Sequence, residues 1–138
     1  MKKYVYTYGV FDLLHPGHVV LLNNAKLLGD YLIVGIVSDS AVKRKKGEDR
    51  PILSQEDRGM LISNLKCVDE IIYQDEFDPT EQIKAYSHKI DILTKGDDWE
   101  YIPGTEIVEK LGGELIKLPY TLQYSTSSMV NQIKEGKE

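Results

Sequence analysis

The stretch TYGVFDLLHPGHVVLLNNAKLLGD, residues 7–30, passes from an apolar strand through a glycine turn into an amphipathic helix. We predict a short strand over Val5–Tyr8 and a helix from about His18 to Leu28, whose apolar side chains share one face. Gly29 follows the last apolar position and ends the helix. A strand joined directly to a helix is the repeating unit of α/β proteins, so this stretch decides the fold class.

Two histidines, His15 and His18, stand where this strand gives way to the helix. The first turn of a helix offers unpaired backbone N–H groups and a partial positive charge, which suit a phosphate chain. Pro16 fits a first-turn position, Gly17 leaves room for close approach of a ligand, and Gly9 provides a turn upstream. The alternative is that one histidine caps the helix and the other is an ordinary surface residue. We favour an anion site.

Strands and helices continue to alternate along the rest of the chain. Further strands are predicted over Tyr31–Val37, Asp69–Tyr73, Ile90–Leu93 and Leu115–Leu118, and helices over Ser54–Lys66, Thr80–Ser87, Glu106–Leu111 and Ser125–Lys134. No helix is predicted between residues 39 and 46. The pattern indicates a Rossmann-like, doubly wound parallel sheet in a single domain over residues 1–138. Ligands of such sheets bind beyond the carboxyl ends of the strands.

Composition narrows the class of protein. The net charge is −5, and the basic residues gather at Lys43–Lys46, which argues against nucleic acid and for a small anionic ligand. One cysteine, Cys67, excludes an internal disulfide framework. The longest apolar run, Tyr31–Val37, is too short to cross a bilayer, and we identify no signal peptide, so we expect a cytoplasmic location without membrane insertion.

Five motifs occur in one order: YGVFDLLHPGH (8–18), KRKKGEDRPI (43–52), EDR (56–58), KGDDW (95–99) and YSTSSMV (124–130). Together they resemble the HxGH nucleotidyltransferases of the cytidylyltransferase-like superfamily, across nearly the whole chain. The first half and GDDWE look most similar to glycerol-3-phosphate cytidylyltransferases. KRKKGEDRPI and IPGTEIVEKLGGEL (102–115) look most similar to heptose-1-phosphate adenylyltransferases.

The resemblance implies a role for each motif. The expected catalytic residues are His15, His18 and Lys46. The expected nucleotide-binding residues are Tyr8, Gly9, Val10, Phe11, Gly17, Asp39, Gly96, Asp97, Asp98, Trp99, Tyr120, Ser125, Thr126 and Ser127. The expected acceptor-binding residues are Asp12, Lys43 and Arg58.

Each of these roles has a simpler structural alternative. The basic run at 43–46 could be a solvated loop. Asp12 and Asp39 could cap turns, and Arg58 could pair on a helix surface with a neighbouring carboxylate. Asp97 and Asp98 without a third ligand are weak evidence for a metal cage, so we expect Mg²⁺ to arrive with the triphosphate and no dedicated protein site.

The C-terminal motif departs from that of the cytidylyltransferases. Tyr120 stands where those enzymes carry an arginine, and Gln123 replaces a glycine. Our first expectation is nevertheless transfer of CMP from CTP to a small phosphorylated alcohol such as glycerol 3-phosphate, with release of pyrophosphate. The alternatives are an adenylyltransferase acting on a sugar 1-phosphate and a nucleotide-binding module without turnover. A homodimer is expected from the resemblance alone.

Overall fold

A computed structural model describes residues 1–97, 99–119 and 133–134. They contain one parallel sheet of five strands, in the order β3-β2-β1-β4-β5. The strands are β1 (Tyr4–Gly9), β2 (Tyr31–Val37), β3 (Glu70–Gln74), β4 (Ile92–Gly96) and β5 (Glu114–Leu118). The helices are α1 (Pro16–Lys26), α2 (Asp39–Lys46), α3 (Gln55–Ser63), α4 (Thr80–Ala85) and α5 (Thr105–Lys110).

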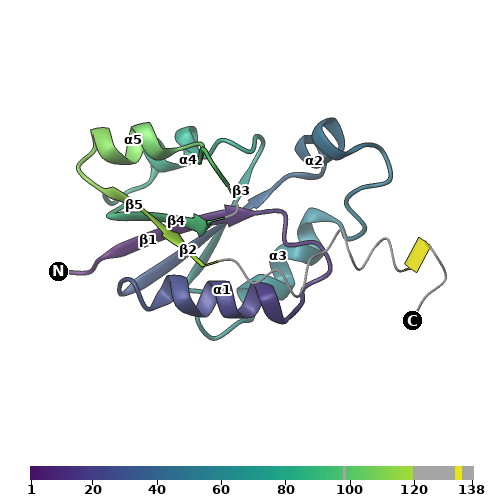
Figure 1. The fold of residues 1–138 in the computed structure, drawn as a ribbon, viewed down its shortest axis with the longest axis horizontal. Helices are drawn as coiled ribbons and strands as arrows, with labels where there is room; N and C mark the ends of the chain where they lie inside the picture. Colours follow the sequence, from purple (N-terminus) through teal and green to yellow (C-terminus); the bar gives the residue numbers. More distant parts are fainter. Residues whose placement is uncertain (98, 120–132, 135–138) are drawn as a thin grey trace.

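Helices cover both faces of the sheet. Figure 1 shows α1 and α3 on one face and α4 and α5 on the other. Along β2, Leu32, Val34 and Ile36 join the core on the α1 side, while Ile33 joins the core on the opposite face. A continuous apolar strand buried on both faces is what a parallel sheet requires. The predicted Rossmann-like, doubly wound fold is confirmed.

The order of the strands creates a switch point between β1 and β4. From β1 the chain proceeds outward through β2 to β3, and it then returns to lay β4 against the other side of β1. The connections that follow β1 and β4 therefore leave the sheet in opposite directions, which opens a crevice at the carboxyl edge. This edge is where the motifs were expected to meet.

One helix, α2, was not predicted from the sequence. Ser38 begins it, because its side chain accepts a hydrogen bond from the backbone N–H of Ala41 at 3.3 Å. Gly47, with φ +102°, ends it in a conformation that suits glycine. The helix has eight residues, of which only Ala41 and Val42 are buried, so it shows too few apolar positions for a helical period to be recognised.

The other boundaries differ by a few residues from the predictions. Helix α1 begins at Pro16 rather than His18, and α3 ends at Ser63, before Lys66. The predicted last helix from Ser125 falls outside the described residues except for 133 and 134. No helix within the described part of the chain has the length and apolar character needed to cross a bilayer.

Candidate active site

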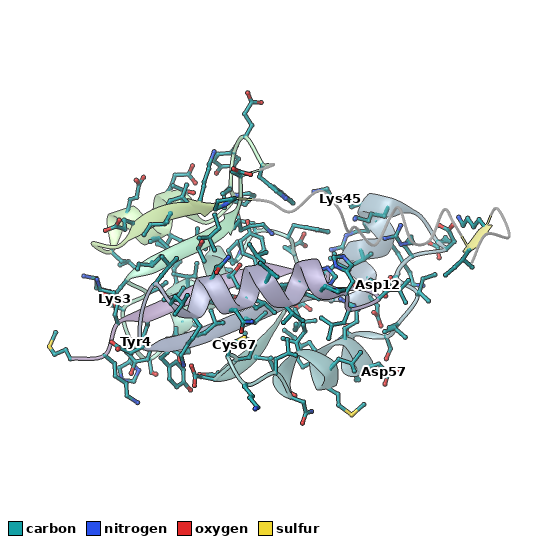
Figure 2. All side chains as sticks on the ribbon, turned by 60° about the horizontal axis from the view of Figure 1, so that its bottom comes forward. Lys3, Tyr4, Asp12, Lys45, Asp57 and Cys67 are labelled. Atoms are coloured by element: carbon teal, nitrogen blue, oxygen red, sulfur yellow. The ribbon has the colours of Figure 1, made fainter. Side chains whose placement is uncertain are left out.

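The candidate site lies at the carboxyl edge of the sheet, where the connections after β1, β2 and β4 meet. Figure 2 shows Asp12, in the connection after β1, on the same side of the molecule as Lys45 on α2. Tyr4 and Lys3, at the beginning of β1, lie at the opposite end. The chain thus separates a binding edge from the edge at which its strands begin.

The two histidines of the HxGH motif stack at the beginning of α1. Their ring centroids are 3.7 Å apart and their planes differ by 17°. His15 is the N-cap of the helix, with extended backbone, and Pro16 occupies the first turn. The ring of Phe11 meets His18 edge-on at 5.5 Å and closes the inner side of the pair. Helix geometry therefore holds both imidazoles at the amino end of α1.

The hydrogen bonding of His18 fixes which ring nitrogen carries its proton. The backbone N–H of His15 donates to Nδ1 of His18 at 3.3 Å, so Nδ1 is an acceptor and the proton lies on Nε2. Burial, and secondarily the neighbouring His15, lowers the pKa of His18 to about 4. Burial also lowers the pKa of His15. At neutral pH the pair therefore offers neutral N–H donors rather than two positive charges.

The basic run occupies the last turn of α2. Lys46, the last residue of the helix, has a lowered pKa, first because of partial burial and then because Arg50 and Lys45 lie close by. Lys43 is exposed on the same helix. The run is thus helical rather than a solvated loop, and it directs cations toward the carboxyl edge.

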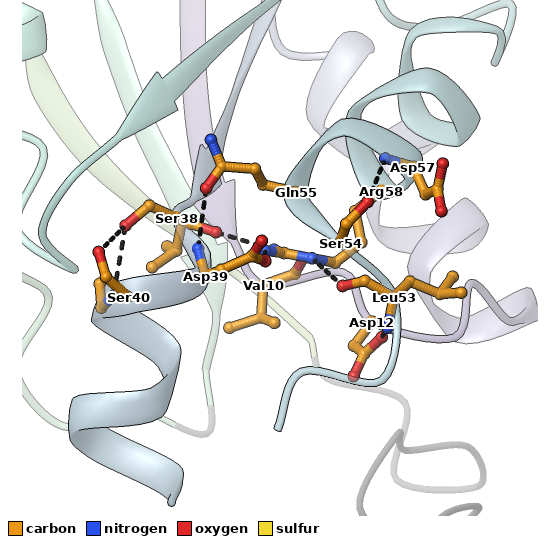
Figure 3. A network of polar contacts seen from close by, with 12 residues as sticks. Val10, Asp12, Ser38, Asp39, Ser40, Leu53, Ser54, Gln55, Asp57 and Arg58 are labelled. Atoms are coloured by element: carbon orange, nitrogen blue, oxygen red, sulfur yellow. Dashed lines mark hydrogen bonds and ion pairs between the residues drawn. The ribbon is translucent and has the colours of Figure 1, made fainter. Parts of the chain in front are cut away.

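Arg58 is completely buried and joins the ends of two strands. Its guanidinium donates to the carbonyls of Val10 and Val37, each at 2.8 Å, and to Leu53 O at 3.0 Å. It also donates to the carboxylate of Asp39 at 2.7 Å (Figure 3). These four bonds give Arg58 a place in the frame of the site, and the predicted contact with the acceptor gains no support from this geometry.

Asp12 and Asp39 both hold protein groups in this structure. The buried carboxylate of Asp12 accepts the backbone N–H groups of Ile52 at 2.7 Å and Leu53 at 2.9 Å. Asp39 begins α2, and its side chain remains one-third exposed beside Arg58. Asp12 therefore fixes the loop between α2 and α3, whereas the side chain of Asp39 remains partly accessible.

A series of contacts between aromatic rings and ammonium groups lies around the end of β4. Nζ of Lys95 lies 4.1 Å from the ring centroid of Tyr8 and 4.5 Å from that of Trp99. Nζ of Lys45 also lies 5.0 Å from the Trp99 ring, and it lies 4.3 Å from the ring of Phe77. Lys95 also donates to the carbonyl of Tyr8 at 2.7 Å. Cation–π contacts thus hold Trp99 between β4 and α2.

Sequence reasoning missed two cations of this edge, Lys95 and Arg50. Lys95 belongs to the quoted KGDDW motif and Arg50 to KRKKGEDRPI, so the motifs were recognised while these members were not assigned roles. The strand was predicted to end at Leu93, whereas in the structure β4 continues to Gly96 and buries Lys95, at a position where a lysine is rare unless it has partners. A lysine next to an apolar strand was therefore the sequence signal that could have identified Lys95 as a residue of the site.

The remaining predicted residues divide into two groups. Gly9, Val10, Phe11 and Gly17 lie in β1, in the connection after it and at the beginning of α1, and Gly96 ends β4. Asp97 follows Gly96, and its backbone N–H donates to Leu118 O at 2.8 Å. The predictions for Asp98, Tyr120, Ser125, Thr126 and Ser127 lie outside the described residues.

A hollow of about 420 Å³ opens between α2 and the loops after β3 and β4. It is lined by Ala41, Arg44, Lys45, Glu76, Phe77, Asp78, Tyr101 and Pro103. This volume lies within the usual range of small-molecule sites, and its wall mixes aromatic rings with charged groups. Within the described ranges, no group of three or more histidine, cysteine, aspartate or glutamate side chains could hold a metal ion.

Residues 6–131 match the sequence profile of the family described as Cytidylyltransferase-like. The chain belongs to the cytidylyltransferase-like family. This membership confirms the predicted resemblance and the expectation of a nucleotidyltransferase. The motifs at the carboxyl edge therefore lie within a cytidylyltransferase-like domain.

Named relatives of this cytidylyltransferase-like domain include two bifunctional proteins. HldE of Helicobacter pylori (strain P12) is 44% identical over 133 residues, which are 96% of this chain and 28% of that protein. HldE of Wolinella succinogenes is 45% identical over 137 residues, 96% of this chain and 27% of that protein. The chain thus spans little more than a quarter of the curated relatives it matches.

A solved structure gives the same picture of the fold. The crystal structure of a lipopolysaccharide core biosynthesis protein from Thermoplasma volcanium GSS1 is 34% identical, with a TM-score of 0.74. The match covers 88% of this chain and 99% of that chain. The cytidylyltransferase-like domain described here therefore has a counterpart of similar extent.

Proposed function

We propose that this domain transfers an adenylyl group from ATP to a sugar 1-phosphate of the heptose 1-phosphate kind. An oxygen of the acceptor phosphate forms a bond to the α-phosphorus of ATP. The bond between the α-phosphorus and the oxygen that bridges to the β-phosphate breaks, and pyrophosphate leaves with the electron pair. The acceptor phosphate is already ionised near neutral pH, so the reaction needs no strong general base.

The observation that carries this proposal is the 44–45% identity to the HldE proteins over 96% of the chain. That identity favours adenylyl transfer to heptose 1-phosphate over our first expectation, CTP and glycerol 3-phosphate. The two segments that resemble heptose-1-phosphate adenylyltransferases, 43–52 and 102–115, border the hollow beside α2. The altered C-terminal motif agrees, because Tyr120 replaces the arginine of the cytidylyltransferases.

The polar wall of the hollow also suits a sugar better than glycerol. Arg44, Glu76, Asp78 and Tyr101 offer donors and acceptors around a space that Lys45 borders. Hydroxyl groups of a sugar ring need such partners when water is excluded, and a three-carbon acceptor would leave many of them unused. We therefore propose that the acceptor sugar occupies this hollow, with its phosphate directed toward Lys46.

The stacked histidines supply the donors for the reacting phosphate. The N–H at Nε2 of His18, held in place by the bond at Nδ1, would stabilise charge that develops on the α-phosphate. Lys46 adds a positive charge from the end of α2. Mg²⁺ carried by the triphosphate would neutralise the leaving pyrophosphate, and the chain itself contributes orientation.

Product analysis by phosphorus NMR tests the proposal. The protein is mixed with Mg²⁺, ATP or CTP, and heptose 1-phosphate, another sugar 1-phosphate or glycerol 3-phosphate. We expect an ADP-sugar and pyrophosphate, with the highest kcat/KM for ATP and the heptose. A preference for CTP and glycerol 3-phosphate would restore the first expectation, and absence of turnover with every pair would favour the non-catalytic alternative.

A further inference from the structure

The chain contains three arginines, and two of them are engaged by protein groups. Arg44 lies on the surface of α2, where it donates to Asp75 O and pairs with Glu76. Arg58 is the buried clamp between β1 and β2. The third arginine, Arg50, lies in the loop between α2 and α3, and neither of these two structural roles applies to it.

The guanidinium of Arg50 is held inside the molecule with poor compensation. Its side chain is only 12% exposed, and its Nε is buried without a hydrogen-bond partner among the described residues. The nearest carboxylate, Asp12, is 3.9 Å away, beyond hydrogen-bond distance. Both Asp12 oxygens already accept backbone N–H groups from Ile52 and Leu53. A buried donor without a partner destabilises a folded protein, so its presence needs an explanation, and a bound ligand that accepts from it is one.

A second cation lies beside Arg50. Lys46 is close enough for Arg50 to lower its pKa, as like charges do. The loop keeps them together, because the backbone N–H of Arg50 donates to Gly47 O at 3.2 Å and Asp12 anchors the next residues. The two carboxylates near this pair are already engaged, Asp12 by backbone N–H groups and Asp49 by Lys134. With Lys134 counted, three cations face two carboxylates, and the positive charge that is left over would be neutralised by a phosphate dianion.

The position of Lys46 and Arg50 relative to the sheet indicates which phosphate group they would bind. Helices α2 and α3 connect β2 to β3, on one side of β1, whereas β4, which contains Lys95 and precedes Trp99, pairs with β1 on its other side. The stacked histidines end the connection after β1, between the two sides. An acceptor on the α2 side and a nucleotide on the β4 side would thus meet at the histidines, as displacement at the α-phosphorus requires.

From this arrangement we infer that Arg50, together with Lys46, binds the phosphate group of the acceptor. This inference rests on the proposed nucleotidyl transfer and adds to it the residue that positions the attacking phosphate. Arg50 takes the role that sequence reasoning gave to Arg58. Its planar guanidinium can donate two parallel bonds to phosphate oxygens, which the ammonium of a lysine cannot reproduce.

Steady-state kinetics of Arg50→Gln and Arg50→Lys test the assignment. For Arg50→Gln we expect the KM of the acceptor to rise by about tenfold or more, while the KM of the triphosphate changes less than about threefold. Arg50→Lys should recover part of the loss, because it keeps the charge without the planar fork. Lys84→Gln, which removes an exposed charge on α4, is the matched control and should change neither KM.

Two further measurements separate ligand binding from structural support. The melting temperature of ligand-free Arg50→Gln should equal or exceed that of the wild type, because the substitution removes an unpartnered donor and a like-charge contact. Inorganic phosphate, titrated calorimetrically as a probe, should bind the wild type more tightly than Arg50→Gln. A lower melting temperature with both KM values raised together would overturn the inference, as would an unchanged KM for the acceptor. If product analysis selects CTP and glycerol 3-phosphate, the same kinetics with that pair still test Arg50.

Discussion

His18 performs two separable tasks at the scale of a single residue. Its Nδ1 accepts the backbone N–H of His15 and thereby supports the beginning of α1, while its Nε2–H remains as a donor for the proposed α-phosphate. Asparagine places an oxygen near the position of Nδ1, and glutamine places an amide nitrogen near the position of Nε2. The two substitutions can therefore remove one task at a time.

We expect His18→Asn to lower kcat by about 100-fold while the melting temperature changes little, because a donor to developing charge is worth that much in comparable sites. His18→Gln should keep more activity and lose more stability. Steady-state kinetics and thermal unfolding of both variants check this pairing. Equal losses of activity in both, or none in either, would contradict the separation of tasks.

The pKa of His18 also links stability to pH. The folded-state pKa is about 4, below the ordinary value of 6.5, so between these values the unfolded chain binds a proton that the folded chain does not. The contribution of neutral His18 to the free energy of unfolding is therefore fully present above about pH 6.5, and it is lost as the pH falls toward 4. We expect a loss of about 3 kcal/mol in the free energy of unfolding, measured with urea at several pH values. His18→Asn should remove much of this dependence, whereas His88→Asn, at an exposed position, should retain it.

At the scale of secondary-structure elements, Arg58 connects α3 to the ends of β1 and β2. Its bonds to Val10 O and Val37 O hold the two strand ends together, and its pair with Asp39 fixes the beginning of α2 (Figure 3). Removal of this guanidinium leaves buried carbonyl groups without donors. The residue thus acts on the site through the elements it joins.

Arg58→Leu should reduce the free energy of unfolding by about 3 kcal/mol or more, as loss of one partner of a buried charged network does. Arg44→Leu, which removes an exposed ion pair on α2, should change it by less than about 1 kcal/mol. Urea titrations of both variants make the comparison. A similar small effect in both would mean that the buried bonds of Arg58 contribute little to the frame.

At the scale of the whole molecule, the binding edge depends on loops from both halves of the sheet. The connections after β1 and β2 supply the histidines, Lys46 and Arg50, and the connection after β4 supplies Trp99. The described side chains include no group of three or more histidine, cysteine, aspartate or glutamate residues that could hold a metal ion, and Mg²⁺ borne by the triphosphate remains a prediction. A homodimer also remains a prediction.

The magnesium prediction can be tested directly. If the ion arrives with ATP, EDTA should leave the melting temperature of the nucleotide-free protein unchanged, because no part of the fold depends on a resident ion. The same EDTA should abolish turnover, and excess Mg²⁺ should restore it. A lower melting temperature in EDTA alone would instead indicate a resident metal site. Thermal unfolding with and without EDTA, followed by an activity assay on the same samples, distinguishes the two cases.

The sequence by itself determined the elements whose signals are local. Strand β2 was predicted with its observed bounds, Tyr31–Val37, because a continuous apolar run requires burial on both faces. The beginning of α3 was predicted at Ser54, one residue from its observed start, since the capping of a helix depends on side chains within one turn. The two histidines were located because the HPGH motif and the strand-to-helix transition occupy adjacent residues. Helix α2 escaped prediction because only two of its residues are buried.

Only the tertiary structure shows which arginine is fully hydrogen-bonded by protein groups and which keeps a buried donor without a partner among the described residues. Arg50 and Arg58 are eight positions apart and equally charged, and no local pattern distinguishes an engaged guanidinium from an unengaged one. The partners of Arg58 come from residues 10, 37, 39 and 53, whereas Nε of Arg50 has none among the described residues. Hydrogen-bond satisfaction depends on groups that are distant in sequence and meet only when the sheet assembles. For that reason the motif could be recognised from the sequence, but the role of each arginine could not.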